Sequence, residues 1–417
     1  MVMAAGPSCL PIQFERMVEV MYLLLDARYI SYHNWEMVFL EEMSGAPCTA
    51  LTFIGSTFNK WLSNDTISHG LITGLLSHWP DIRRWIIYLH TSCIKDESYD
   101  IDIRKACKTA VVIFLALTRD GILKGWSKKV ITDTKIMPLI FDLWKLETFD
   151  ARFSSYIGRS RTERESVILN SCLLMASEAK TPIDWDHALR PFDGQPTEVV
   201  RTALSHLSQE VARRDLDPEC IAWDIHIITA FSFRDDMRDD FFRLGVITTL
   251  TNVIHLIVGR SFESSDLTFA ARCISNVSLF LRTRMQDADG IPWVSEAVRA
   301  GVIMGLVKSQ RFIPFMDNDR AREGPTDVLY SVLPAYTVYR SLLLPIVSAM
   351  DEVKELGLDE QMDKRGKLYA SWKFLLETTE RRRWLKYDRP EHVHVQTCHN
   401  DDVRRIIYDS CYRDVDA

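Results

Sequence analysis

The chain of 417 residues is poor in the residues that form tight turns. It has 17 glycines and 15 prolines, which together fall below the roughly 12% expected from average usage. Because tight hairpin turns consume these residues, their scarcity argues against a sandwich of many strands. A hydrophobic content of 47% is nevertheless ample for a core, so we expect a folded chain built from helices.

Long apolar runs and a secretory signal are also missing. The longest apolar run, residues 110–117, has eight residues, whereas a membrane-spanning helix needs roughly twenty. Residues 1–10 show no basic start followed by an apolar stretch, which a secretory signal requires. We therefore expect no membrane partner and an intracellular protein, cytoplasmic or nuclear.

No stretch of the chain collects lysine and arginine into a long stripe, and 50 basic against 57 acidic residues give a net charge of −7. Proteins whose main partner is nucleic acid usually carry such a stripe, so nucleic acid is not expected as the partner. The nine cysteines are scattered, several of them in apolar helical stretches, where a thiol behaves as a small hydrophobic group. This distribution indicates a reducing compartment.

Motifs that announce an enzyme are absent too: the sequence has no Gly-x-Ser-x-Gly, no Gly-x(4)-Gly-Lys and no His-Glu-x-x-His. The best local arrangement is Asp184-Trp-Asp-His187, in which a carboxylate can orient an imidazole as in general-base sites. We prefer the alternative, a solvated loop with a buried tryptophan, and predict no catalytic or cofactor-binding residues. An enzyme that uses Asp186 and His187 remains an alternative.

What the sequence does contain is an internal repeat. The octamer Arg243-Leu-Gly-Val-Ile-Thr-Thr-Leu250 recurs as Arg299-Ala-Gly-Val-Ile-Met-Gly-Leu306, with Arg, Gly, Val, Ile and Leu in the same places. An echo at a fixed offset is typical of stacked helical repeats. Apolar residues after the first octamer keep helical spacing in two stretches, which predicts a glycine turn followed by two amphipathic helices. Those residues are Val246, Leu250, Val253 and Ile257, then Leu267, Ala270, Ile274, Val277 and Leu281.

Weaker copies extend the array toward both ends of the chain. Gly70-Leu-Ile-Thr-Gly-Leu75 and Arg119-Asp-Gly-Ile-Leu-Lys-Gly-Trp126 resemble the octamer, and the wide gap between Gly121 and Gly245 indicates one unit that has lost its glycine. The acidic run 235–240 is interpreted as a helix N-terminus, with metal-binding carboxylates as the alternative. The other expected elements are helices over 103–118, 197–211, 220–233, 302–311 and 328–350, the last kinked or divided by Pro334 and Pro345, and a surface loop over 180–196.

The signature Arg-x-Gly-Val-Ile-x-x-Leu, with an apolar helix before its next turn, resembles the armadillo repeat. In that family a short helix, a glycine turn and two longer helices form each unit. The resemblance covers residues 65–350 and implies an all-α fold, an armadillo-like α-solenoid (alpha-alpha superhelix). Residues 1–64 are then expected to be N-terminal capping helices, residues 351–388 a charged C-terminal helix and residues 389–417 a tail.

The tail carries side chains with metal chemistry. His392-Val-His-Val-Gln-Thr-Cys398-His399, followed by Cys411, supplies imidazole and thiolate, which are zinc ligands. Structural zinc sites use closely spaced ligand pairs, however, and twelve residues separate Cys398 from Cys411. We name Cys398, His399 and Cys411 as metal-ligand candidates, with solvated side chains as the alternative.

A second resemblance lies at the same place. A helical-repeat region, a charged helix ending in Arg381-Arg-Arg-Trp384 and then Thr-Cys-His-Asn-Asp resembles the approach to the finger in fungal MYND-type zinc-finger proteins. The resemblance implies that Cys398 occupies the first ligand position, but Val403 stands about where the second cysteine belongs. Only 19 residues follow Cys398, too few for the seven cysteines and one histidine of such a finger. The chain is expected to carry a vestigial finger, with zinc as a cofactor only if a complete finger exists.

These expectations describe a non-enzymatic interaction scaffold. Its partner is expected to be a protein or peptide, bound on the concave side of the array or on projecting loops. A zinc-binding MYND-type adaptor with a truncated C-terminus is one alternative, and an uncharacterised enzyme on a helical-repeat fold is the other. The arginines at 381–383 are expected to complement a helix C-terminus rather than to bind anions or to direct nuclear import.

Overall fold

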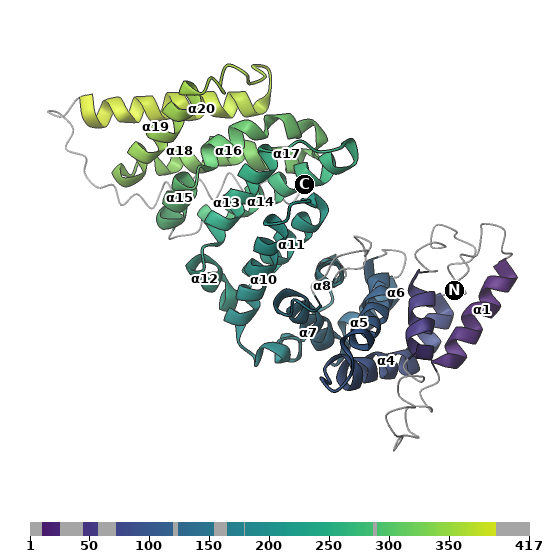
Figure 1. Cartoon of the computed structure of the whole chain (residues 1–417). Helices are drawn as coiled ribbons and strands as arrows, with labels where there is room; N and C mark the ends of the chain where they lie inside the picture. The colour runs from purple at the N-terminus through teal and green to yellow at the C-terminus, as the bar shows by residue number, and fades with distance from the viewer. Residues whose placement is uncertain are drawn as a thin grey trace.

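The computed structural model of the chain describes residues 11–25, 45–56, 72–119, 124–153, 165–178, 180–286 and 290–388. Every regular element within these ranges is helical, which confirms the all-α prediction. Figure 1 shows the helices side by side in a bent row, with α1 (Pro11–Leu24) at one end and α20 (Lys367–Arg383) at the other. No single helix in these ranges is long and apolar enough to cross a membrane; two bent pairs, α12 with α13 and α15 with the helix after it, reach that length and apolarity only when counted together.

The described elements between the two ends are all helical, with η marking 3-10 or π-helical turns. In chain order they are helical residues 45–56 and 72–77, α4 (Trp79–Tyr88), η2 (Leu89–Ile94), α5 (Ile101–Leu115), η3 (Ala116–Arg119), α6 (Lys124–Ile131), α7 (Ile136–Phe149), α8 (Glu165–Glu178), α9 (Trp185–Ala188), η6 (Arg190–Phe192), α10 (Pro196–Val211), α11 (Pro218–Ser232), α12 (Asp235–Arg243), α13 (Val246–Val258), α14 (Ser264–Met285), α15 (Gly290–Arg299), α16 (Val302–Lys308), η7 (Ser309–Phe315), α17 (Asp319–Asp327), η8 (Val328–Val332), α18 (Leu333–Tyr336) and α19 (Arg340–Glu355).

The longer helices pack in two rows. In the first row α4, α7, α10, α13, α16 and α19 each contact the next member, and in the second row α5, α8, α11, α14, α17 and α20 do the same. Across the rows, α7 packs on α8, α10 on α11, α13 on α14 and α19 on α20. Because an amphipathic helix must bury its apolar face against a partner, this packing joins the buried apolar side chains into one cluster that extends from Val18 to Leu375.

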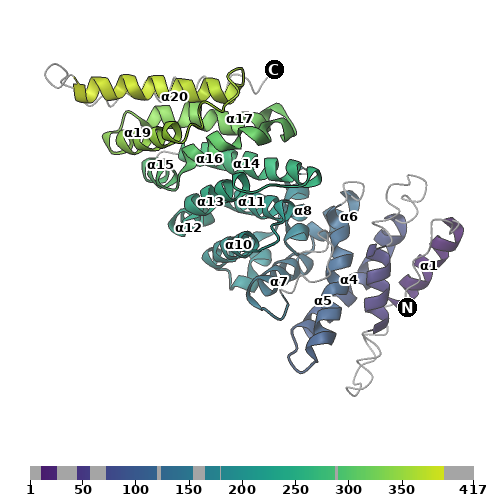
Figure 2. The same cartoon turned by 45° about the horizontal axis from the view of Figure 1, so that its top comes forward.

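A short helix precedes the helix pair in the later part of the chain. α12 lies against α10, α11 and α13, and α15 lies against α13, α14, α16 and α19. In Figures 1 and 2 both short helices lie on the same side of the row, and α8, α14 and α17 lie on the other side. In the first copy α12, with 9 residues, is followed by the longer α13 and α14, with 13 and 22 residues, which is the order that the armadillo resemblance implies. In the second copy α16 and α17 have 7 and 9 residues and exceed the 10 residues of α15 only with the turns η7 and η8 that continue them.

The two octamer glycines make the expected turns. Gly245 and Gly301 adopt φ values of 81° and 86° and directly precede α13 and α16, in a left-handed conformation that costs glycine little. The turns are not equivalent in space. A Cβ on Gly301 would lie 2.8 Å from Nε2 of His255, whereas a Cβ on Gly245 would meet nothing within 4 Å.

The prediction of a surface loop over 180–196 is wrong. The segment forms α9 and η6, which both pack on α7, and Ala188, Leu189 and Phe192 are buried. The unit has also kept a glycine, because Gly194 adopts φ 67° shortly before α10 begins. Proline and glycine are typical of loops, but here they delimit short helical elements that come directly before α10, as α12 comes before α13 and α15 before α16.

Two predictions near the C-terminus also change. The single charged helix expected over 351–388 is divided, because α19 ends at Glu355, Gly357 turns the chain with φ 62° and α20 begins at Lys367. The helix expected over 328–350 is divided after Pro334, between α18 and α19, whereas Pro345 lies inside α19. The octamer glycines Gly70 and Gly121 lie outside the described residues.

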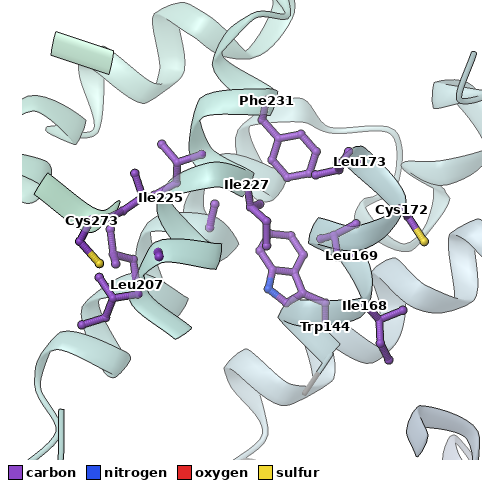
Figure 3. Packing of buried hydrophobic residues seen from close by; sticks show 14 of the residues in the cluster. Trp144, Ile168, Leu169, Cys172, Leu173, Leu207, Ile225, Ile227, Phe231 and Cys273 are labelled. Atoms are coloured by element: carbon purple, nitrogen blue, oxygen red, sulfur yellow. The ribbon is translucent and has the colours of Figure 1, made fainter. Parts of the chain in front are cut away.

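Aromatic and aliphatic side chains pack together where the two rows meet in the middle of the chain. Figure 3 shows Trp144 of α7 beside Leu169 of α8 and beside Ile227 and Phe231 of α11. The rings of Trp144 and Phe231 have centroids 6.2 Å apart. These four side chains come from three helices, so the helices cannot slide past one another without losing close packing.

Candidate functional site

The predicted metal-ligand candidates Cys398, His399 and Cys411 lie outside the described residues. Within the parts of the chain that the structure describes, no three His, Cys, Asp or Glu side chains are placed to share a metal ion. The acidic run 235–240 forms the first turns of α12, as expected, with Asp235 and Asp236 in its first turn.

The Asp184–His187 pair, which the sequence offered only as the alternative to a solvated loop, does form, but it caps a helix. Oδ2 of Asp184 lies 2.8 Å from Nδ1 of His187, and Oδ1 accepts a hydrogen bond of 3.2 Å from the His187 backbone N–H. That backbone N–H, together with the imidazole, holds the pKa of Asp184 below its ordinary value. Because Asp is a preferred N-cap residue, the start of α9 accounts for this arrangement without catalysis.

A hollow of about 520 Å³ opens on the surface between η2, α5 and α7. We call it the α5–α7 hollow. Its lining combines apolar and charged side chains, which come from segments far apart in the sequence. The apolar residues are Ile94, Leu146 and Phe149, and the charged ones are Lys95, Glu97, Arg104, Asp142, Lys145, Asp150 and Arg152.

Arg104 gives the hollow a fixed positive charge. This side chain is buried, its Nε donates a hydrogen bond of 2.9 Å to the carbonyl of Ile94, and its guanidinium lies 5.2 Å from the ring centroid of Phe153. A guanidinium over an aromatic face gains a cation–π attraction. Arg104 is therefore held in one orientation before any partner arrives.

Asp142 supplies a fixed negative charge on the α7 side. Its Oδ2 lies 2.8 Å from Nε2 of His90 and 3.0 Å from Nζ of Lys95. Burial alone would raise the pKa of Asp142, but His90 and Lys95 hold this pKa below its ordinary value. His90 belongs to the π-helical turn η2, a rare geometry that occurs often at functional sites.

The rim beyond α7 is more open to solvent. Phe149, the last residue of α7, is 55% exposed. Beside it Arg152 pairs with Asp150, with Nη2 2.6 Å from Oδ2. Lys145 donates a hydrogen bond of 2.7 Å to the carbonyl of Pro191, so η6 helps to fix this side of the hollow.

A chain of buried charges lies next to the hollow. Lys108, one helical turn after Arg104 on α5, places Nζ 2.6 Å from Oε1 of Glu165. His206 lies between two further carboxylates, with Nδ1 2.9 Å from Asp224 and Nε2 3.6 Å from Glu147. All five charged side chains that form this chain, from α5, α7, α8, α10 and α11, are almost completely buried.

The charges in this chain stabilise one another. Burial would lower the pKa of His206, but Asp224 and Glu147 raise it well above its ordinary value. Burial would likewise raise the pKa of Glu147, but His206 and Lys108 hold it below its ordinary value. A buried charge is tolerated when it is paired, and no substrate can reach a group that solvent does not reach. These residues therefore hold five helices in register and do not form a site.

Comparisons with models of protein families, with curated proteins and with solved structures find no match for this chain.

The side chains that line the α5–α7 hollow indicate what it can bind. In the described residues that line it, the charged groups pair with one another or with backbone carbonyls, and no serine, threonine or cysteine is among them. Small-molecule sites are mostly apolar and bury their ligand. An open hollow that mixes an exposed ring with arginines suits a segment of polypeptide better, because interfaces are enriched in aromatic residues and Arg.

Sequence reasoning missed both the hollow and the buried chain of charges. One signal was present for the latter: Lys108 interrupts an otherwise apolar helical stretch, where a charge must find a partner. No signal was present for the hollow, because its residues come together only when η2, α5 and α7 pack. Arg104 and Asp142 look like ordinary surface residues of amphipathic helices.

Proposed function

We propose that the chain is an armadillo-like α-solenoid that acts as a non-enzymatic scaffold and binds a segment of a partner protein. The repeated octamers and the contacts of each helix with its counterpart in the next pair support the solenoid. In such an array each unit contacts only its neighbours, and the long surface that results is used for binding. Intracellular action, in the cytoplasm or nucleus, is part of the same proposal.

The α5–α7 hollow is the proposed docking place, and its lining is the observation that carries the proposal. Phe149 offers an exposed ring, and the exposed Arg152 lines the same hollow with its guanidinium held by Asp150. Aromatic and arginine side chains supply most of the binding energy in protein interfaces. The segment expected here is extended, with an apolar side chain against Phe149 and a polar or acidic group facing Arg152.

Selection of peptides tests this proposal. A random peptide library displayed on phage is panned against the full chain, and an enriched peptide is labelled for fluorescence anisotropy. We expect Phe149→Ala to weaken its binding at least ~10-fold, as loss of an interface anchor does. The matched control is Phe315→Ala, because Phe315 is 40% exposed but does not line the hollow; this variant should bind within about twofold of the parent.

Two results would overturn the proposal. Enriched peptides that bind Phe149→Ala as tightly as the parent chain place the docking surface elsewhere. If repeated panning enriches no peptide, while the chain turns over substrates in an activity screen that Asp186→Asn or His187→Gln abolishes, the scaffold itself is wrong and an enzyme takes its place.

We further propose that the chain is related to MYND-type zinc-finger proteins and carries only the start of the finger. The residues that support this relationship are Cys398, His399 and Asn400 after the Arg-rich turn at 381–383. Metal analysis of the purified full chain by mass spectrometry should then find zinc well below one ion per chain. About two zinc ions per chain, the content of a finger with two tetrahedral sites, would contradict an incomplete finger.

A further inference from the structure

Three thiols meet at the N-terminal end of the row. Cys48 lies in the helix over 45–56, Cys93 in η2 and Cys107 in α5. The thiol of Cys48 donates to the sulfur of Cys107, with a distance of 3.8 Å between the two Sγ atoms. Cys93 lies near enough to Cys107 for Cys107 to raise its pKa. Cys107 is thus the centre of a three-thiol cluster.

The approach of Cys48 to Cys107 is fixed by the backbone. A Cβ added to Gly55, which lies two helical turns after Cys48, would be 2.7 Å from the carbonyl oxygen of Ile113. On α5, Ile113 lies almost two turns after Cys107, so the second contact has nearly the same spacing on both helices. The two helices therefore touch at both points and run in the same direction, and only a glycine permits this separation. The close contact between Gly55 and Ile113 therefore keeps the thiol of Cys48 near the thiol of Cys107.

Access and acidity divide the roles within the cluster. Cys48 is half-buried, whereas Cys93 and Cys107 are each 1% exposed. The neighbouring thiols of Cys48 and Cys93 lower the pKa of Cys107, and Cys107 in turn raises the pKa values of Cys48 and Cys93. Solvent thus reaches Cys48 first, and Cys107 beside it is the most acidic of the three thiols.

We propose that Cys48 and Cys107 form an oxidation site, at which hydrogen peroxide converts the two thiols into a disulfide. The sulfur of Cys48 attacks one peroxide oxygen, the O–O bond breaks, and the thiol proton of Cys48 leaves with the departing hydroxide as water. The product is a sulfenic acid on Cys48. The sulfur of Cys107 then attacks the sulfur of Cys48, the S–O bond breaks, and the departing hydroxyl leaves with the Cys107 proton as water. Peroxide gains the two electrons that the sulfurs lose.

The disulfide would join the helix over 45–56 to α5 across 59 residues of sequence. The sulfurs must approach by less than about 2 Å to reach bonding distance, which side-chain rotation and a small helix shift supply. Local opening of the first helix then requires α5 to move with it. Oxidation is therefore expected to slow amide hydrogen exchange in residues 45–56 at least ~10-fold.

Peptide mapping of the full chain tests the site. The reduced protein is treated with hydrogen peroxide, its remaining thiols are alkylated under denaturing conditions, and a protease digest is analysed by mass spectrometry. We expect a linked pair of peptides that contain Cys48 and Cys107 and that dithiothreitol separates. Cys48→Ser should abolish this pair. The matched control Cys172→Ser, at a buried thiol of α8, should leave its yield unchanged.

The mapping of the parent chain decides the matter even if a variant fails to fold. The proposal is wrong if both peptides stay alkylated after peroxide treatment, if Cys48 proceeds to the sulfinic acid without a link, or if Cys48 links to a cysteine other than Cys107. None of these readouts depends on peptide binding at the α5–α7 hollow.

Discussion

His206 shows how single residues of this chain depend on their surroundings. It is enclosed by Asp224 and Glu147, so the protonated imidazole is the stable form in the fold. His226, on α11, is only half-buried, and burial is the only cause that acts on it and lowers its pKa. The pKa values of the two histidines are thus shifted in opposite directions by the presence or absence of carboxylates.

We predict that these two histidines titrate on opposite sides of pH 6.5. Nuclear magnetic resonance of the imidazole Cε1–H groups, with His206→Gln and His226→Gln used to assign the signals, should show His206 still protonated when His226 has become neutral. Titration of His206 at or below pH 6.5 would contradict the buried ion pairs.

The same shift sets the direction of a stability change. Because the pKa of His206 in the folded chain is raised above its ordinary value of 6.5, the folded chain binds this proton more tightly than the unfolded chain does. The resulting stabilisation is complete below about pH 6.5 and is lost as the pH rises through the folded value. Weakening of this part of the core is therefore expected on the alkaline side.

At the scale of elements, the sequence predicts those helices whose own apolar residues recur with helical spacing, without regard to the rest of the fold. The helices over 246–258 and 264–285 could be predicted because their apolar residues recur with helical spacing. α9 and η6 could not, because elements of three or four residues show no period and form only when Phe192 is buried against α7. The hollow was unpredictable for the same reason, since Arg104 and Asp142 meet only through packing.

The two octamer turns provide a matched pair for mutation. Gly245→Ala and Gly301→Ala both place an alanine at positive φ, which costs about 1–2 kcal/mol. Only Gly301→Ala also drives a Cβ into the ring of His255, whose Nε2 is hydrogen-bonded to the carbonyl of Ala300 at 3.1 Å. Loss of that bond adds roughly 1 kcal/mol. We therefore predict a larger loss of unfolding free energy for Gly301→Ala.

Urea unfolding of the two variants measures the difference. In a His255→Ala background the excess cost of Gly301→Ala should disappear, because the clashing ring is gone. Equal losses of unfolding free energy for the two glycine variants in the parent chain would show that the contact between Gly301 and His255 does not affect stability.

For the whole molecule, the contacts of each helix are mostly with its neighbours in the two rows, although the buried apolar side chains form one continuous cluster. A continuous cluster is compatible with two kinds of cooperativity. A globular core unfolds as one body, whereas a stack of units loses stability near the site of damage and passes on only what the next interface transmits. A solenoid is therefore expected to lose stability only near a mutated residue, whereas a globular core would lose it everywhere.

Trp126 of α6 and Trp372 of α20 are matched probes in the N-terminal and C-terminal parts of the row, and both are completely buried. Truncation of such a side chain costs roughly 3–5 kcal/mol. In a solenoid, Trp372→Ala should speed amide hydrogen exchange in α17, α19 and α20 but leave α4 and α5 unchanged, and Trp126→Ala should do the reverse, as measured by mass spectrometry. If either variant instead speeds exchange evenly along the chain, the rows behave as a single core, and the proposed solenoid, with the scaffold built on it, has no energetic basis.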